Sequence, residues 1–235
     1  MSRGLRGWIL ALGCVLLASA AVADDWGWPE PASFHARGFG FVAEIFPPGS
    51  RQNQGGDRAF CYFYEVGYPG TRWDVHAKLL WKAPVVNGRM PVEGLVSMDG
   101  RLVTLNEWGA VGHAHAIVVY DRRGQLVADI QGDKVVAALG PEGKAHLRPS
   151  ESSLWWNQDA KYYFSRDGSS PGSYRQGARL YVRLNWPRVV VVNLETGELK
   201  GGAPAEFPEL TVIAADTNAA TAVWKTSLRF SSAPI

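Results

Sequence analysis

The chain has 235 residues, with 24 Lys and Arg against 22 Asp and Glu and a formal net charge of +2. The predicted leader described next carries two arginines and no acid, so the rest of the chain has 22 charges of each sign. Nucleic acid and anionic membrane surfaces are bound through a clustered positive excess, so we expect neither as a partner.

Residues 1–23 have the pattern of a cleavable signal peptide. Two early arginines precede the uncharged stretch 8–20, which is too short to span a bilayer stably. Ala21 and Ala23 then stand at the small-residue positions of a cleavage site. We therefore expect an exported protein, periplasmic or secreted, with no stable membrane anchor after cleavage.

The remaining residues, 24–235, predict a single β-rich domain. Short runs rich in Val, Tyr, Phe, Trp and Leu alternate with Gly and Pro, which favours strands joined by turns. Asn87-Gly88 has the composition of a type I′ hairpin turn. The fold class we expect is all-β, made of antiparallel meanders. The predicted strands span 39–46, 58–66, 75–82, 101–106, 116–120 and 125–130.

Other elements are few. One short helix is predicted over 133–139, where Gly140-Pro141 ends it, within a polar connection over 132–153. Two further strands are predicted near the C-terminus, over 211–214 and 222–230. Cys61, the only cysteine outside the leader, lies in an alternating strand pattern and is expected to be a small buried hydrophobe.

Two stretches of the chain, about 95–130 and 162–200, repeat one pattern. Ser97-Met98-Asp99-Gly100 returns at residues 165–168, and the turn over 120–126 returns at 193–199. The offset varies between the matched turns while the order of the strands is kept, as in repeats with variable insertions. A third possible unit spans 58–90.

This pattern resembles a β-propeller blade, and the Trp108-Gly109 pair before a Val-Val-Tyr-Asp strand is similar to uncharacterised exported bacterial proteins built of blade-like repeats. The resemblance implies a fold and no activity. Closed propellers need about four to eight blades, so a partial propeller and two packed sheets are both open.

The strongest candidate for chemistry is the stretch 106–115. In an extended backbone, His113 and His115 would present both imidazoles on one face of the strand. Glu107 would then complete three ligands for zinc, which leaves a position for an activated water. The alternative is that these residues are only polar surface groups. No catalytic residue is assigned otherwise, because the sequence holds no familiar catalytic motif.

Tryptophan is abundant, with ten residues in the chain. Trp26, Trp28, Trp155 and Trp156 fall in segments predicted to be irregular, and Trp108 lies in the candidate loop. Exposed indoles stack on sugars or anchor protein partners, while buried ones would plug the ends of the sheets. Trp108, Trp155 and Trp156 are the candidate ligand-binding residues.

Three functions follow from these patterns. We expect a non-catalytic exported binding module, with a protein or a glycan as its ligand. One alternative is a lectin-like domain that binds carbohydrate or cell wall. The other is an extracytoplasmic metal-dependent hydrolase with zinc at Glu107, His113 and His115.

Overall fold

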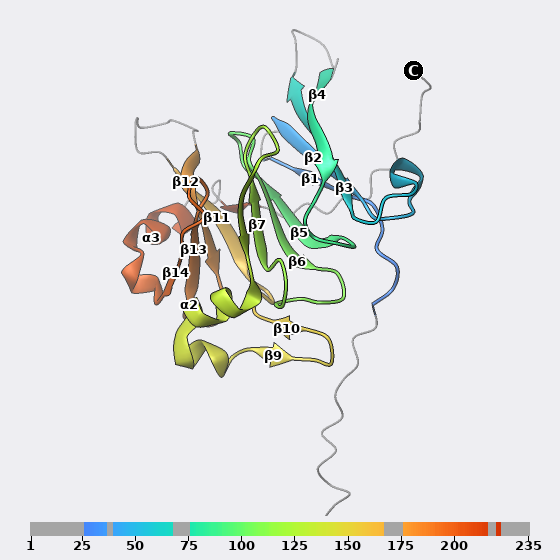
Figure 1. The fold of residues 1–235 in the computed structure, drawn as a ribbon. Helices are drawn as coiled ribbons and strands as arrows, with labels where there is room; N and C mark the ends of the chain where they lie inside the picture. The colour runs from blue at the N-terminus through green and yellow to red at the C-terminus, as the bar shows by residue number, and fades with distance from the viewer. Residues whose placement is uncertain (1–25, 37–39, 68–75, 167–175, 216–219, 222–235) are drawn as a thin grey trace, which may run out of the picture.

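The computed structural model describes residues 26–36, 40–67, 76–166, 176–215 and 220–221, and its fold is mainly β (Figure 1). Three meanders, each of four antiparallel strands, follow one another along the chain, and we call them sheets I, II and III. Sheet I holds β1 (Ala32–His35), β2 (Phe41–Phe46), β3 (Phe60–Gly67) and β4 (His76–Pro84). Sheet II holds β5 (Pro91–Val96), β6 (Leu102–Glu107), β7 (Ile117–Tyr120) and β8 (Leu126–Ile130). Sheet III holds β11 (Lys161–Arg166), β12 (Gln176–Arg183), β13 (Val189–Asn193) and β14 (Leu199–Gly202), with β15 (Ala220–Thr221) added beside β11.

The remaining elements are short. A two-stranded sheet pairs β9 (Arg148–Pro149) with β10 (Leu154–Trp155). The helices are η1 (Arg51–Asn53), α2 (Gly132–Lys144), η2 (Pro204–Glu206) and α3 (Pro208–Ala215). In the part of the chain that the structure describes, none of the helices combines the length and the apolar character of a membrane span.

The two central strands of sheet II, β6 and β7, are buried on both faces. Every residue from Leu102 to Asn106 in β6 is buried, and so is all of β7. Val103 and Val119 pack into a cluster shared with sheet III, whereas Leu102 and Val118 pack into a second cluster shared with sheet I. A strand covered on both sides reads as a continuous apolar run, which explains the sequence of these two strands.

Sheet III is covered on its other face by a helix. Val190 and Val192 of β13 point to the cluster shared with sheet II, and Val191 points to a third cluster with Leu210 of α3. The Tyr181 hydroxyl, on β12, donates to Glu209 Oε1 at 2.7 Å and fixes the helix to the sheet. The layers therefore run in the order sheet I, sheet II, sheet III and α3, as Figure 1 shows.

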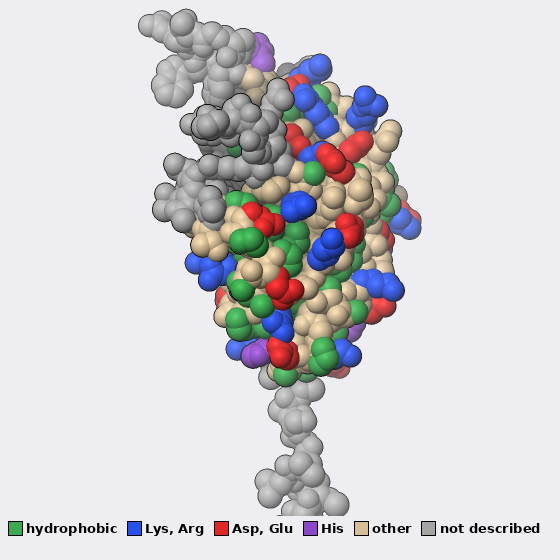
Figure 2. All heavy atoms as spheres, turned by 90° about the vertical axis from the view of Figure 1, so that its left-hand side faces the viewer, with side chains coloured by type: hydrophobic (Ala, Val, Ile, Leu, Met, Phe, Trp, Pro, Cys, Tyr) green, Lys and Arg blue, Asp and Glu red, His purple; other side chains and the backbone are tan. Residues whose placement is uncertain are grey.

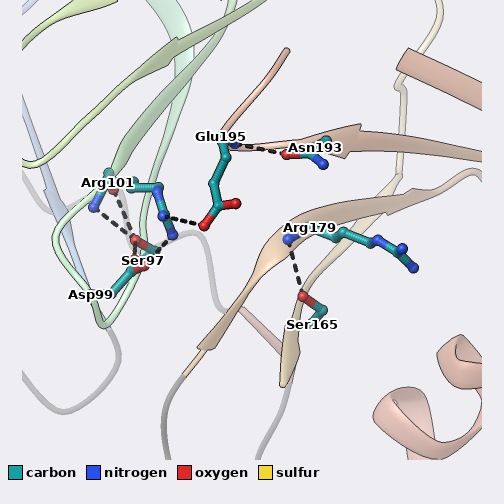
Figure 3. A network of polar contacts seen from close by, with 7 residues as sticks. All are labelled: Ser97, Asp99, Arg101, Ser165, Arg179, Asn193 and Glu195. Atoms are coloured by element: carbon teal, nitrogen blue, oxygen red, sulfur yellow. Dashed lines mark hydrogen bonds and ion pairs between the residues drawn. The ribbon is translucent and has the colours of Figure 1, made fainter. Parts of the chain in front are cut away.

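The turns of sheets II and III repeat the same hydrogen bonds. Ser97 Oγ accepts from the amide of Arg101 at 2.8 Å, and Ser165 Oγ accepts from the amide of Arg179 at 3.0 Å (Figure 3). Ser97 and Arg101 also hold the Asp99 carboxylate, as expected for a residue that stabilises a turn. The predicted match of Asp99, Asp167, lies outside the described residues.

The second pair of matching turns follows β7 and β13. Asp121 Oδ1 accepts from two backbone amides, and so does Asn193 Oδ1. Gly124 and Gly197 take φ values of +78° and +75° at corresponding positions. The two stretches predicted to repeat, 95–130 and 162–200, thus lie in sheets II and III, and side-chain oxygens accept from backbone amides at the matching turn positions.

Two predictions on local structure need correction, and a third is not tested. Residues 211–214 are in α3 and not in a strand, because Pro208 and Glu209 in the first turn favour a helix start over the β-branched pattern. Asn87-Gly88 makes no hairpin: β4 and β5, on either side of it, belong to different sheets. The predicted strand over 222–230 lies outside the described residues.

The first meander also begins earlier than the third unit predicted over 58–90. It starts at β1, directly after Pro31. This strand has only four residues, too few to be distinguished in the sequence from an irregular N-terminal segment. The helix predicted over 133–139 is confirmed within α2, where Gly140 leaves the helical conformation with φ +72° and a second helical turn follows Pro141. Mainly β architecture with antiparallel meanders is confirmed.

The surface over sheet III and α3 carries both signs of charge. Figure 2 shows acidic and basic side chains interspersed on this face, with hydrophobic side chains scattered among them. This distribution agrees with the nearly balanced counts of charged residues in the sequence.

Gly94 provides a test of the packing between sheets I and II. A Cβ on Gly94, in β5, would lie 2.6 Å from the buried ring of Phe34 in β1. We expect Gly94→Ala to lower the free energy of unfolding by about 2 kcal/mol, because overpacking forces the ring out of place. Urea unfolding followed by circular dichroism measures the change. Gly67→Ala, at a strand position with open space around the added Cβ, is the control, and equal midpoints for the two variants would contradict this packing.

Candidate functional site

The candidate site is the loop between β6 and β7, which begins after Glu107. The backbone of the loop and of the strand end before it is contorted: Gly109 and Gly112 have φ of +81° and +72°, and Asn106 and His115 have φ of +59° and +52°. Positive φ is uncommon for residues other than glycine and costs free energy, so such a conformation persists only where surrounding contacts enforce it. The extended backbone on which the two-histidine prediction rested is therefore wrong.

The Asn106 side chain supplies those contacts. It is fully buried, and its Oδ1 accepts from Trp156 Nε1 at 2.8 Å and from the amide of Gly112 at 3.1 Å. Its Nδ2 donates to Asn157 Oδ1 at 3.0 Å. One side chain thus joins the start of the loop, its middle and the segment before β11.

Further buried polar groups extend this arrangement. Asn87 Nδ2 donates to the carbonyl of Asn106 at 2.9 Å, and Thr104 Oγ1 donates to Asn87 Oδ1 at 2.6 Å. Asn157 Nδ2 donates to the Tyr162 hydroxyl at 2.9 Å. We call these residues the amide network: Asn87, Thr104, Asn106, Trp156, Asn157 and Tyr162.

Tyr162 is neutral in this environment. Burial raises the pKa of its phenol well above the ordinary value, and the nearby Glu93 carboxylate adds to the rise. The amide network is thus made of neutral groups that are hydrogen-bonded to one another, which is how buried polar side chains avoid a large desolvation cost.

The two histidines of the loop lie in different surroundings. His115 Nδ1 is 3.0 Å from both carboxylate oxygens of Asp129 in β8, and its Nε2 is 4.0 Å from Glu107 Oε2. His113 lines a cleft of about 660 Å³ between the loop and α2, with Asp133 and Lys144 on the helix side. Glu107 and Asp129 therefore both lie beside His115.

The predicted zinc site required three ligands in one place. Among the residues that the structure describes, no group of three His, Cys, Asp or Glu side chains is placed to hold a metal ion. Asp129 was missed from the sequence because it joins the cluster through the pairing of β7 with β8, where Val118 lies opposite Asp129.

Tryptophans from three distant segments meet beside the loop. The Trp26 ring stacks on Trp155, with a centroid distance of 5.8 Å and planes 6° apart, and meets Trp108 edge-on at 5.1 Å. Trp108 Nε1 donates to the carbonyl of Gly27 at 2.9 Å and so holds the N-terminal segment against the loop. We call Trp26, Trp108 and Trp155 the tryptophan cluster.

The five tryptophans singled out from the sequence therefore fall into three roles. Trp108 and Trp155 lie together, half-buried, in the cluster with Trp26. Trp156 is only 2% exposed and serves the amide network, so it is not available to a ligand. Trp28 is 91% exposed, two residues from the cluster along the chain.

Comparison of the chain with protein-family models, with curated proteins and with solved structures finds no match in any of the three.

The amide network predicts a large effect of substitution at Asn106. We expect Asn106→Ala to lower the free energy of unfolding by about 3 kcal/mol or more, because it leaves three buried partners unpaired and puts alanine at positive φ. Asn106→Gly removes only the side-chain bonds and should cost less. Urea unfolding separates the two contributions.

The control for this series is Asn193→Ala. Asn193 makes two similar bonds to backbone amides, but in an exposed turn. Its loss should cost about 1 kcal/mol, because water replaces the lost acceptor. Equal losses at Asn106 and Asn193 would show that the buried network does not hold the loop.

Cys61 is expected to be unreactive in the folded protein. It is fully buried, and burial raises the pKa of its thiol well above the ordinary value, with the Glu44 carboxylate adding to the rise. Since the thiolate is the reacting species, alkylation of Cys61 by iodoacetamide should be at least about a hundredfold slower in buffer than in urea. Mass spectrometry of the peptide that contains Cys61 measures both rates, and similar rates would contradict the buried position.

Proposed function

We propose that the protein is an exported binding module, in which sheets I, II and III are blades of a partial β-propeller and the ligand lies against Trp28 and the tryptophan cluster. The observation that carries this proposal is the 91% exposure of Trp28, two residues along the chain from Trp26, whose indole meets two others from distant parts of the chain. Large exposed aromatic side chains next to a packed aromatic group are typical of binding surfaces.

The cluster also offers an unused hydrogen-bond donor. Trp26 Nε1 is buried and has no hydrogen-bond partner among the described residues. A buried N–H without a partner costs free energy, and a ligand that displaces the covering side chains and supplies an acceptor recovers that cost. An apolar surface with a few polar groups of fixed position is the usual composition of a ligand site.

Rigidity supports the same function. The amide network fixes the loop that carries Trp108, and the Trp108 indole in turn holds Gly27. A surface that is ordered before the ligand arrives loses less conformational entropy on binding. The buried hydrogen bonds of the amide network therefore favour ligand affinity as well as the stability of the fold.

The parallel Trp26 and Trp155 rings favour a glycan as the ligand. Stacked indoles present flat apolar faces, and sugar rings carry flat C–H faces with hydroxyl acceptors at the rim. The hydrolase alternative requires three metal ligands in one place. Glu107 and His115 lie close together, but among the described residues no group of three ligands is placed to hold a metal. We therefore propose binding and not catalysis.

Trp28→Ala tests the proposed surface. Tryptophan emission and calorimetry are measured with neutral oligosaccharides of β-1,4-linked glucose and of N-acetylglucosamine. We expect one series to bind, and Trp28→Ala to weaken it at least tenfold, about 1.4 kcal/mol, without changing the unfolding midpoint. Leu126→Ala, which removes another exposed hydrophobic side chain (51% exposed), should leave affinity unchanged.

If neither series binds, glycan is not the ligand. If a glycan binds equally to the protein and to Trp28→Ala, the ligand lies elsewhere and the proposed surface is wrong.

A further inference from the structure

The gap between Glu107 and His115 has the width of one bridging atom. Glu107 Oε2 and His115 Nε2 are 4.0 Å apart, which is too far for a direct hydrogen bond. A single nitrogen or oxygen placed between them reaches both atoms at about 2.8 Å, a normal hydrogen-bond length. The three side chains here, Glu107, His115 and Asp129, are each 20–25% exposed, so a small group can enter from solvent.

The flanking residues determine what kind of group fits. An ionised carboxylate accepts hydrogen bonds and cannot donate them. Asp129 therefore requires a proton on His115 Nδ1, which lies 3.0 Å from both of its oxygens. In the neutral imidazole this leaves the lone pair of Nε2 facing the gap. Glu107 Oε2 also accepts, so the bridging atom has to donate two hydrogen bonds.

A water molecule, a primary ammonium and the NH2 groups of an amide or a guanidinium donate twice from one atom; of these, the primary ammonium is the compact group that also carries a charge. The carboxylates of Glu107 and Asp129 bring two negative charges to a partly desolvated site, where charge interactions are stronger than in bulk water. A hydroxyl group donates only once and leaves one acceptor unpaired. Charge and donor count together favour the ammonium.

The position of the Glu107 carboxylate depends on a glycine. A Cβ on Gly88 would lie 2.6 Å from Glu107 Oε1, and the backbone of Gly88 does not have a positive φ. Alanine at this position is thus compatible with the backbone and displaces only the flexible end of Glu107. Gly88 leaves the space that the carboxylate occupies beside His115.

We propose that Glu107 and His115, with His115 oriented by Asp129, bind a primary ammonium group of a ligand. Glu107 and His115 are the binding residues, and Asp129 is a positioning residue. This inference goes beyond the proposed function and does not depend on the tryptophan surface.

The experiment uses methylammonium as the probe at about pH 8, with ionic strength held constant. Long-range proton–nitrogen correlation spectra report the His115 ring nitrogens, assigned by comparison with His115→Gln. We expect methylammonium to shift the Nε2 signal saturably, with a Kd on the order of 10 mM. Tetramethylammonium and methanol are the control probes. The first carries the same charge without N–H donors, and the second donates only one hydrogen bond.

Two variants locate the effect. Glu107→Gln removes the charge at nearly constant shape, and Gly88→Ala displaces the carboxylate without removing it; each should weaken methylammonium at least tenfold. Gly67→Ala is the matched control and should not change it. A shift with tetramethylammonium as large as that with methylammonium, or no saturable shift at His115, would overturn the proposal.

Amino sugars and lysine side chains both present this group, and a second comparison separates them. Glucosamine carries its amine directly on the ring, whereas the ε-ammonium of N-acetyl-lysine methylamide stands on a slender chain. Tighter binding of one identifies the source, and binding of neither, with methylammonium bound, would show that the site admits nothing larger than the probe and so is not a ligand site.

Discussion

The hydrogen bonds of the Asn106 amide determine where the β6–β7 loop lies, and the candidate site is built on that loop. Each partner of this amide is a buried group that would otherwise be unpaired: the Gly112 amide, the Trp156 indole N–H and Asn157 Oδ1. An unpaired buried donor or acceptor costs about 1–3 kcal/mol. The free energy of these hydrogen bonds therefore exceeds the cost of the left-handed backbone of Asn106.

The stacking of the sheets explains why this polar network is needed. Sheets I, II and III pack face to face, and some residues of their connecting segments, such as Asn87 and Asn157, are buried. Backbone groups in those segments, such as the carbonyl of Asn106, need partners that no strand provides. Asparagine carries both donors and acceptors on one short side chain, and Asn87, Asn106 and Asn157 each serve a different connection.

Much of the fold follows from local patterns in the sequence. Matching Ser and Asp or Asn positions predicted the turns of sheets II and III, because side-chain bonds to nearby backbone amides define such turns locally. The same reasoning failed at Asn87-Gly88, where Asn87 bonds to groups 17 and 19 residues away. It also missed Asp129, because this residue reaches His115 only through strand register. Interactions set by distant partners leave no local signal.

The same network also connects to the histidine. Asn87 Nδ2, which donates to the carbonyl of Asn106, lies 3.4 Å from the carbonyl of His115. Gly88, the next residue, leaves room for the Glu107 carboxylate. The segment between sheets I and II therefore positions both sides of the Glu107–His115 gap, one through a hydrogen bond and the other through the absence of a side chain. These contacts come from the segment between sheets I and II and not from the β6–β7 loop. The gap therefore keeps its width only while sheets I and II stay packed.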